Sequence, residues 1–207
     1  MFLFDFHHHH PQKKSGLYNA NILEDVFTKP FSIGLHPKDI DENWKKNLQV
    51  VKDISADKNC KAIGECGLDR LIAVDFELQK SVFEAQIDWA NEIQKPIIIH
   101  CVRSFSETIA LGKKSKVQMV IHGFNKKNAL AQELLSHGFS LSFGKAVLNR
   151  VSLQLVIKEV PLEKIFLETD DSDFEIVELY QKVADIKSIS VEELQNQIQK
   201  NLENTIK

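Results

Sequence analysis

The chain has 207 residues, 43% of them hydrophobic, a size that suits a single domain spanning 1–207. Its formal net charge of −3 excludes a global basic field that would attract nucleic acid or a membrane surface. There is no long apolar run and no basic leader, and the three cysteines are odd in number, so we expect a cytoplasmic protein with reduced thiols and no membrane contact.

The first predicted element is a buried strand, Phe2–Phe6, which leads into four consecutive histidines. Alternate strand residues point to the same face, so we expect His7 and His9 to converge and His8 and His10 to face away. Two neutral imidazoles at one strand end form a ready pair of metal ligands. The alternative is the remnant of a purification tag, which seldom sits directly behind a hydrophobic strand.

Short apolar segments then alternate with longer amphipathic ones. The other predicted strands are Phe31–Leu35, Ala62–Glu65, Ile97–Cys101, Met119–His122, Ser140–Phe143 and Ile165–Glu168, with a weak further candidate at Leu17–Leu23. The predicted helices are Asp75–Gln94, Lys126–Ser136, Asp173–Ala184 and one that starts after Ser190, where Ser190 and Glu193 fit a capping box.

The alternation of nearly all-apolar strands with helices predicts an α/β fold with a parallel sheet and crossover helices. The number and spacing of the strands favour a TIM-type (β/α) barrel. An open doubly wound sheet is the alternative. It is disfavoured because no glycine-rich nucleotide fingerprint follows a strand.

Many of the predicted strands end in a side chain that can bind a metal. These residues are His7, His9, Glu65, His100, His122, Glu168 and Asp170. In barrels of this type the C-terminal strand ends line the active-site mouth, so the set is more informative than any single histidine. Four imidazoles and two carboxylates can hold two divalent metal ions, zinc, magnesium or manganese. Glu65 is the best candidate for a bridging ligand, and Asp170 could also accept a proton from an attacking water.

Six sequence motifs follow one another in the order of a known family. They are Asp5-Phe6-His7-His8-His9, Ile33-Gly34-Leu35-His36-Pro37, Ala62-Ile63-Gly64-Glu65-Cys66-Gly67-Leu68-Asp69, Pro96-Ile97-Ile98-Ile99-His100 with Arg103, Ile121-His122-Gly123-Phe124 with Leu141-Ser142-Phe143-Gly144, and Leu167-Glu168-Thr169-Asp170. Through them the chain resembles, over nearly its whole length, the TatD-related metal-dependent hydrolases. These amidohydrolase-like barrels include deoxyribonucleases.

The resemblance implies a role for each matching residue. The metal ligands are then the pair His7 and His9, the bridging Glu65, the pair His100 and His122, and Asp170, which is also the expected general base. His36 and Arg103 match polar positions near the mouth that could hold a phosphate oxygen, although Arg103 could equally begin a solvated helix or form a structural ion pair. Asp69 and Glu168 are expected to be structural or to support the ligands.

The chain also departs from the family pattern. Few residues separate the first strand from Gly34, so the barrel is expected to be irregular or shortened near its second strand. After Asp170 the family usually carries a Ser-Pro segment, whereas this chain continues Asp171-Ser172-Asp173. We expect that acidic segment to open the site and to repel a DNA backbone.

Three functions are consistent with these patterns. The first is a two-metal phosphodiesterase or deoxyribonuclease that acts on DNA ends, with DNA or a small phosphodiester as a transient substrate and no obligate protein partner. The second is a hydrolase of a small ester, amide or phosphoester, which the weak basic character favours. The third is a metal-binding protein without turnover, against which the complete ligand set argues. Local lysine pairs such as Lys126-Lys127 are interpreted as solvated faces.

Overall fold

The computed structural model describes residues 3–13, 15–24 and 27–206. Its sheet has seven strands, all paired in parallel and ordered as they occur in the chain. The strands are β1 Tyr18–Asn19, β2 Phe31–Ile33, β3 Cys60–Asp69, β4 Ile97–Val102, β5 Met119–Ile121, β6 Ser140–Phe143 and β7 Ile165–Leu167. This curled parallel sheet confirms the predicted α/β fold of the TIM type.

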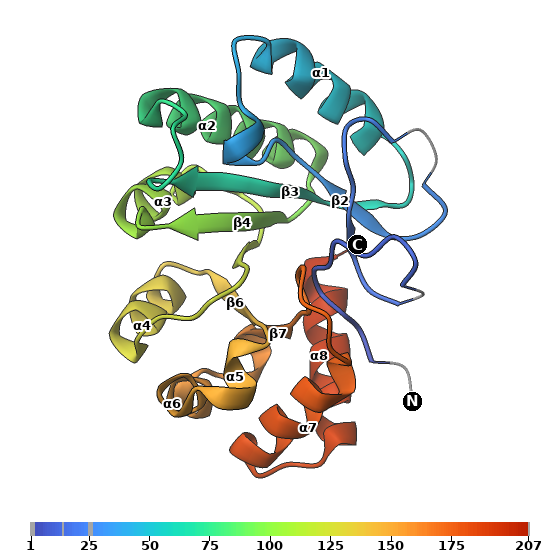
Figure 1. Cartoon of the computed structure of the whole chain (residues 1–207), viewed down its shortest axis with the longest axis vertical. Helices are drawn as coiled ribbons and strands as arrows, with labels where there is room; N and C mark the ends of the chain where they lie inside the picture. The colour runs from blue at the N-terminus through green and yellow to red at the C-terminus, as the bar shows by residue number, and fades with distance from the viewer. Residues whose placement is uncertain (1–2, 14, 25–26, 207) are drawn as a thin grey trace.

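Helices cover the outer side of the curled sheet (Figure 1). They are α1 Trp44–Ser55, α2 Phe76–Ile93, α3 Phe105–Gly112, α4 Asn128–Ser136, α5 Ala146–Asn149, α6 Val151–Glu159, α7 Ile176–Lys187 and α8 Val191–Thr205, with two 3₁₀ turns at Pro37–Asp39 and Leu162–Lys164. The capping box at the start of α8 is present as predicted. None of the helices in the described ranges is both long and apolar enough to cross a membrane.

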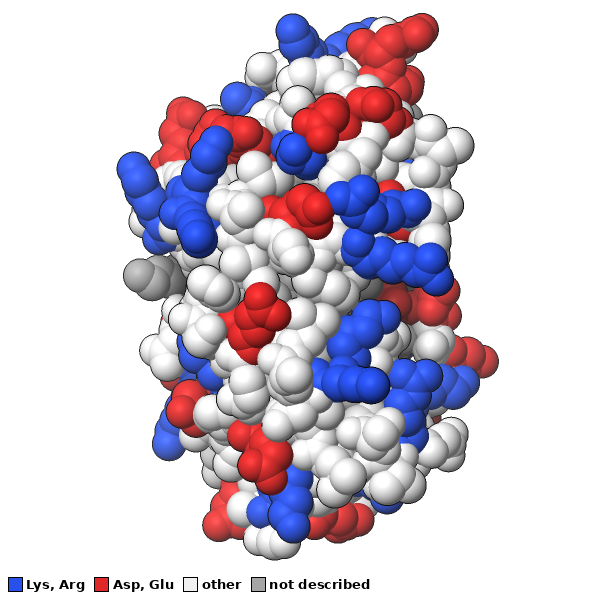
Figure 2. Space-filling model, turned by 90° about the vertical axis from the view of Figure 1, so that its left-hand side faces the viewer, with Lys and Arg blue, Asp and Glu red and all other residues white. Residues whose placement is uncertain are grey.

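The arrowheads of β3 and β4 point to the left in Figure 1, and Figure 2 looks onto that side of the molecule. Charges of both signs cover this face, with a band of Lys and Arg side chains running down its right-hand part (Figure 2). The carboxyl ends of the strands therefore open toward a surface that is mixed in charge, although the whole chain is slightly acidic.

Most of the predicted strands are confirmed. The ends of β2, β4, β5, β6 and β7 lie within two residues of the predicted ones. The weak candidate at Leu17–Leu23 contracts to the two residues of β1, so the barrel is irregular there. Helices α1, α3, α5 and α6 fall outside the predicted set. α5 and α6 are short and meet at Arg150, so neither offers a long periodic pattern.

The first predicted strand, Phe2–Phe6, is wrong as a regular strand. Phe2 lies outside the described residues, and residues 3–6 form no strand. The segment nevertheless joins the two edges of the sheet. Its His8 forms parallel bridges with both Tyr18 of β1 and Asp170 after β7. Residues 5–9 therefore occupy the place of a barrel strand and bring the histidine pair to the carboxyl end of the sheet.

A side chain interrupts the pairing of this segment with the β7 edge at one position, between the backbone hydrogen bonds from Phe6 N–H to the Leu167 carbonyl and from Asp170 N–H to the His7 carbonyl. The carboxylate of Asp5 accepts hydrogen bonds from Thr169 N–H at 2.9 Å and from the Thr169 hydroxyl at 2.6 Å. It also forms an ion pair of 2.9 Å with Lys13 Nζ, which contacts the Thr169 hydroxyl as well. Since the Thr169 N–H is satisfied by a side chain, the backbone ladder is interrupted there.

β3 is longer than predicted because two glycines allow it to run close to β4. Gly64 has a φ of 139°, and a Cβ added to it would lie 2.4 Å from the Ile98 carbonyl oxygen. Gly67 has a φ of 141° and a similarly close approach to His100. The pairing register shifts between Ile63 and Cys66, which is where β3 carries Glu65.

We expect Gly64→Ala to destabilise the protein by about 2–4 kcal/mol, because it adds both left-handed strain and a clash with the Ile98 carbonyl. Gly138→Ala is the matched control. Its φ is 86°, and nothing lies within 4 Å of an added Cβ, so only about 1 kcal/mol should be lost. Urea unfolding of both variants measures the difference, and equal losses would show that the approach to β4 is unimportant.

Candidate metal centre

A single buried carboxylate stands at the centre of the candidate site. Glu65 is 5% exposed, and its two oxygens face different histidine pairs. Oε1 lies 2.8 Å from both His100 Nδ1 and His122 Nε2. Oε2 lies 3.3 Å from His7 Nε2 and 3.4 Å from His9 Nε2. The geometry therefore divides the site into two halves that share one carboxylate.

Asp170 completes the half that contains His7 and His9. Its Oδ1 lies 3.4 Å from His9 Nε2 and 3.8 Å from His7 Nε2. The ligand atoms of these three residues lie within 4.8 Å of one another, and the same holds for His7, Glu65 and His122. The structure thus brings all six sequence-predicted ligands together at the carboxyl end of the sheet.

Two carboxylates behind the histidines orient the rings of the other half. His100 turns its Nε2 to Asp69 Oδ2 at 3.1 Å, which leaves Nδ1 facing Glu65. The Nδ1 of His122 lies 3.5 Å from Oε1 of the fully buried Glu168, which also accepts from Gly123 N–H at 2.6 Å. Carboxylates in such positions fix which imidazole nitrogen faces a metal.

The residues fit a divalent cation for two reasons: they are the types that bind metal ions, and one of them has buried nitrogens without a hydrogen-bond partner. His7 is fully buried, and neither of its ring nitrogens forms a hydrogen bond with any described residue. A buried polar atom without a partner is costly, whereas a metal ion would satisfy it. Imidazole nitrogens combined with carboxylate oxygens suit zinc or manganese, and magnesium where open positions remain.

In the metal-free protein, protons replace the cations that the cluster would hold. Burial opposes the charge on Glu65, but the charge of His122 and hydrogen bonds from three histidines hold the pKa of Glu65 well below its usual value. Hydrogen bonds to Asp170 and Glu65 raise the pKa of His9 to about 9. Burial lowers the pKa of His122, but the charge of Glu65 and hydrogen bonds to Glu168 and Glu65 raise it well above its usual value.

We expect metal binding to release about two protons at pH 7, because a ligating imidazole nitrogen must give up its proton. The release from His9 should fade as the pH rises through about 9, where that residue is already neutral, and the apparent metal affinity should rise over the same range. Calorimetric titration of zinc in two buffers with different ionisation enthalpies counts the protons. Binding without proton release at pH 7 would contradict this assignment.

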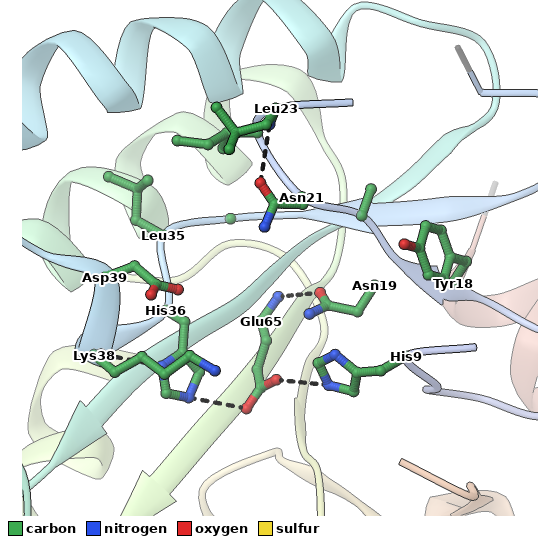
Figure 3. Close-up of a pocket in the computed structure, with 13 residues that line it drawn as sticks. His9, Tyr18, Asn19, Asn21, Leu23, Leu35, His36, Lys38, Asp39 and Glu65 are labelled. Carbon is green, nitrogen blue, oxygen red and sulfur yellow. Dashed lines mark hydrogen bonds and ion pairs between the residues drawn. The ribbon is translucent and has the colours of Figure 1, made fainter. Parts of the chain in front are cut away.

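His36 adopts a different role from the other histidines of the cluster. Its Nδ1 accepts a hydrogen bond of 3.0 Å from Lys38 N–H, so the proton of the neutral ring lies on Nε2. That Nε2 faces Glu65 Oε1 at 3.4 Å (Figure 3). A protonated nitrogen donates a hydrogen bond and does not ligate a metal, so His36 is arranged as a donor at the edge of the site.

Arg103 is the one predicted site residue that the structure does not bring to the cluster. It is exposed just after β4, has a left-handed φ of 52° and makes no hydrogen bond or ion pair with another described residue. It is also absent from the described residues that line the two cavities beside the site. Its predicted contact with phosphate stays a prediction.

Three side-chain amides that hold the site, two of them buried in α2, were not predicted from the sequence. The side chain of Gln86 in α2 accepts from Leu35 N–H at 2.7 Å, next to His36. Gln79, which lies nearer the start of the same helix, accepts from Asp69 N–H at 2.8 Å. Asn19 in β1 accepts from the backbone N–H of Glu65 at 2.9 Å. The available signal was a polar residue on the apolar face of the helix predicted at Asp75–Gln94.

Two cavities open beside the cluster. One, of about 380 Å³, has Glu65, His9 and His36 in its wall and extends along Tyr18 and Asn21 (Figure 3). The other, of about 200 Å³, lies against His122 and Asp170. A substrate can therefore approach the cluster through either cavity.

A parallel barrel-type fold with an imidazole–carboxylate cluster at the strand ends defines a class, the metal-dependent hydrolases. The family described as TatD related DNase matches residues 18–207, and the chain belongs to that family.

Curated relatives and a solved structure agree with this assignment. The chain is 34% identical over 145 residues to the "Uncharacterized metal-dependent hydrolase YabD" of Bacillus subtilis, covering 67% of this chain and 57% of that protein. It is 31% identical over 146 residues to the "Uncharacterized metal-dependent hydrolase YcfH" of Escherichia coli K12, covering 68% and 54%. The chain thus spans little more than half the length of these relatives. The crystal structure of YjjV, a TatD homologue from Escherichia coli K12, superposes with a TM-score of 0.83 at 19% identity, covering 99% of this chain and 97% of that one, which supports the fold.

Proposed function

We propose that the protein is a two-metal phosphodiesterase that removes nucleotides from DNA ends. The observation that carries the proposal is the division of Glu65, with one oxygen toward His100 and His122 and the other toward His7 and His9. A shared carboxylate is what allows two like-charged cations to lie about 3.5–4 Å apart. The family description, which names a DNase, supports the choice of a phosphodiester.

Two bound divalent cations would polarise a phosphoryl oxygen and make water a better nucleophile at neutral pH. The protein's own residues supply the remaining steps. Asp170 stays ionised, because the hydrogen bond from His9 and the charges of His122 and His7 overcome the effect of burial and lower its pKa, so it can accept a proton. The Nε2–H of His36 can donate to a non-bridging phosphate oxygen that enters the larger cavity.

A hydrolase of small esters or phosphoesters is the second candidate. Asp171 and Asp173 are exposed immediately after Asp170, and acidic side chains at the mouth disfavour a long polyanion. The two candidates share the metal chemistry and differ only in the size and charge of the substrate that can enter the site.

The test compares substrates under the same metal. We expect zinc- or manganese-dependent hydrolysis of a chromogenic phosphodiester and release of nucleotides from single-stranded DNA, both lost in chelator. Robust hydrolysis of a small ester with no nucleotide release would favour the second candidate. Inertness toward every substrate, with metals bound, would leave a metal-binding protein without turnover.

A further inference from the structure

A separate hollow lies between the start of α4 and α6. Its volume is about 930 Å³, larger than either cavity beside the metal centre. Lys126, Lys127 and Arg150 line it together with apolar side chains that include Leu130 and Leu155. Among the described residues of its lining, Glu159 at the far end of α6 is the one acid. We call this hollow the α4/α6 groove.

The α4/α6 groove continues from the metal centre. Asn125 and Lys126 line both the groove and the 200 Å³ cavity that contains His122 and Asp170. Arg150 donates a hydrogen bond of 3.1 Å from Nη1 to the Asn125 carbonyl, which ties the loop after β5 to the start of α6. A chain-like ligand bound at the metal centre could therefore continue over this loop into the α4/α6 groove and stay in contact with the protein.

Helix α6 presents apolar side chains to solvent along this path. Leu155 is 62% exposed and Val151 is 68% exposed, and the two are four residues apart on one helix face. Exposed apolar residues grouped beside cations are unusual on a surface that only needs to be solvated, and such patches mark binding sites. Figure 2 shows that Lys and Arg side chains gather beside white surface on this side of the molecule.

We propose that the α4/α6 groove binds the part of a single-stranded nucleic acid that extends beyond the phosphate at the metal centre. This inference rests on the proposed function. Lys126, Lys127 and Arg150 offer cations to successive backbone phosphates, while Leu130 and Leu155 offer an apolar wall to the bases. A single strand fits better than a duplex, because only an unpaired strand exposes its base faces to such a wall.

The inference revises the interpretation of Lys126-Lys127 as a merely solvated face. The cations lie on the side of the groove that joins the metal centre, and Glu159 lies at the other end. Phosphates would therefore contact the near part of the groove. The bases would pack toward α6, where Leu155 is accessible.

Binding can be tested without turnover. Fluorescence anisotropy of a labelled oligodeoxythymidylate in chelator, measured over a salt series, reports affinity and the number of phosphate contacts. We expect the double variant Lys126→Gln/Lys127→Gln to bind roughly tenfold more weakly, with a salt slope smaller by about 1.4, or about 0.7 for each lost contact. The matched control is Lys45→Gln/Lys46→Gln, an adjacent exposed pair on α1, which should bind as the unaltered chain does.

A second variant tests the apolar wall. Leu155→Ser should weaken oligonucleotide binding several-fold without changing the salt slope, because it removes apolar contact and no charge. Since Leu155 is largely exposed, the fold should tolerate the change.

Chain length separates this inference from the proposed function. A chromogenic phosphodiester is too small to reach the groove, so Lys127→Gln and Leu155→Ser should hydrolyse it normally while losing activity on longer oligonucleotides. If the unaltered protein hydrolyses no phosphodiester, the proposed function fails, and the anisotropy measurements still decide whether the groove binds a strand. Binding that does not strengthen from a dinucleotide to a longer oligonucleotide would overturn the inference. So would equal losses in the two lysine-pair variants, or equal competition by an acidic peptide.

Discussion

Glu65→Gln is expected to lower metal-dependent turnover by more than roughly 100-fold while leaving the protein folded. The amide has one oxygen and one NH₂ group, so it can face one histidine pair but cannot offer an anionic oxygen to both. The variant should therefore retain at most one tightly bound metal ion. Metal analysis after gel filtration and hydrolysis of a chromogenic phosphodiester measure the two effects.

The control for this variant is Glu92→Gln, which makes the same chemical change on the exposed surface of α2. It should retain metal and turnover. A Glu65→Gln protein that kept two metal ions and near-normal turnover would show that Glu65 is not the bridge.

The metal-free protein provides a second readout of the same substitution. Because the pKa of His9 is raised to about 9 by Asp170 and then Glu65, protonated His9 stabilises the fold fully below its unfolded pKa of about 6.5, and this stabilisation is lost as the pH rises through about 9. Without the charge of Glu65, the decline in urea stability between these pH values should be shallower. An unchanged pH profile would mean that Glu65 and His9 are not coupled.

The fold could be predicted from the sequence because its strands are short, apolar and separated by regular intervals. Burial on both faces of a parallel sheet leaves a nearly continuous apolar run, as in the strand at Ile97–Val102. The irregular form of the first strand could not be predicted, because its pairing is interrupted where the Asp5 carboxylate accepts from Thr169 N–H, far along the chain. Such a contact leaves no periodic signal.

Most of the metal ligands could be predicted because they come at or just after the end of an apolar segment, where strand direction fixes the side of the sheet. Glu65 is the exception, since the sequence placed it at a strand end whereas it lies inside β3, which continues to Asp69. The ligand identities were visible in the sequence, whereas the supporting geometry was not. The hydrogen bond of Gln86 to the backbone beside His36 is made between residues 51 positions apart. Arg103 shows that closeness in sequence is not enough. It follows the ligand His100 by three positions, yet it does not line either cavity beside the site.

The tautomer of His36 also required the structure. The sequence placed this residue among polar groups of the mouth, but its histidine neighbours are candidate metal ligands. The hydrogen bond from Lys38 N–H to Nδ1 of His36 indicates that this residue donates to phosphate and is not a further metal ligand. A local 3₁₀ turn thus decides the chemistry of the residue that precedes it.

Asp170→Asn is expected to abolish turnover, with a loss comparable to that of Glu65→Gln, because an amide neither binds a cation strongly nor accepts a proton. The substitution suits this position sterically. Asp170 has a left-handed φ of 55°, and asparagine adopts that backbone region as readily as aspartate does. The folded state should therefore be preserved, and thermal unfolding of the metal-free variant checks this.

An independent measurement distinguishes loss of a ligand from general damage to the site. The hydrogen bond to Asp170 is the largest cause of the raised pKa of His9, so that pKa should fall from about 9 toward 6.5 in metal-free Asp170→Asn. The titration of the His9 ring protons, followed by NMR, reports it directly. Asp173→Asn, an exposed neighbour on the same acidic segment, should leave both the His9 titration and the turnover of a small chromogenic phosphodiester unchanged. If Asp170→Asn lost turnover while His9 still titrated near 9, the Asp170–His9 contact would be wrong. If it retained turnover, another group would have to accept the proton.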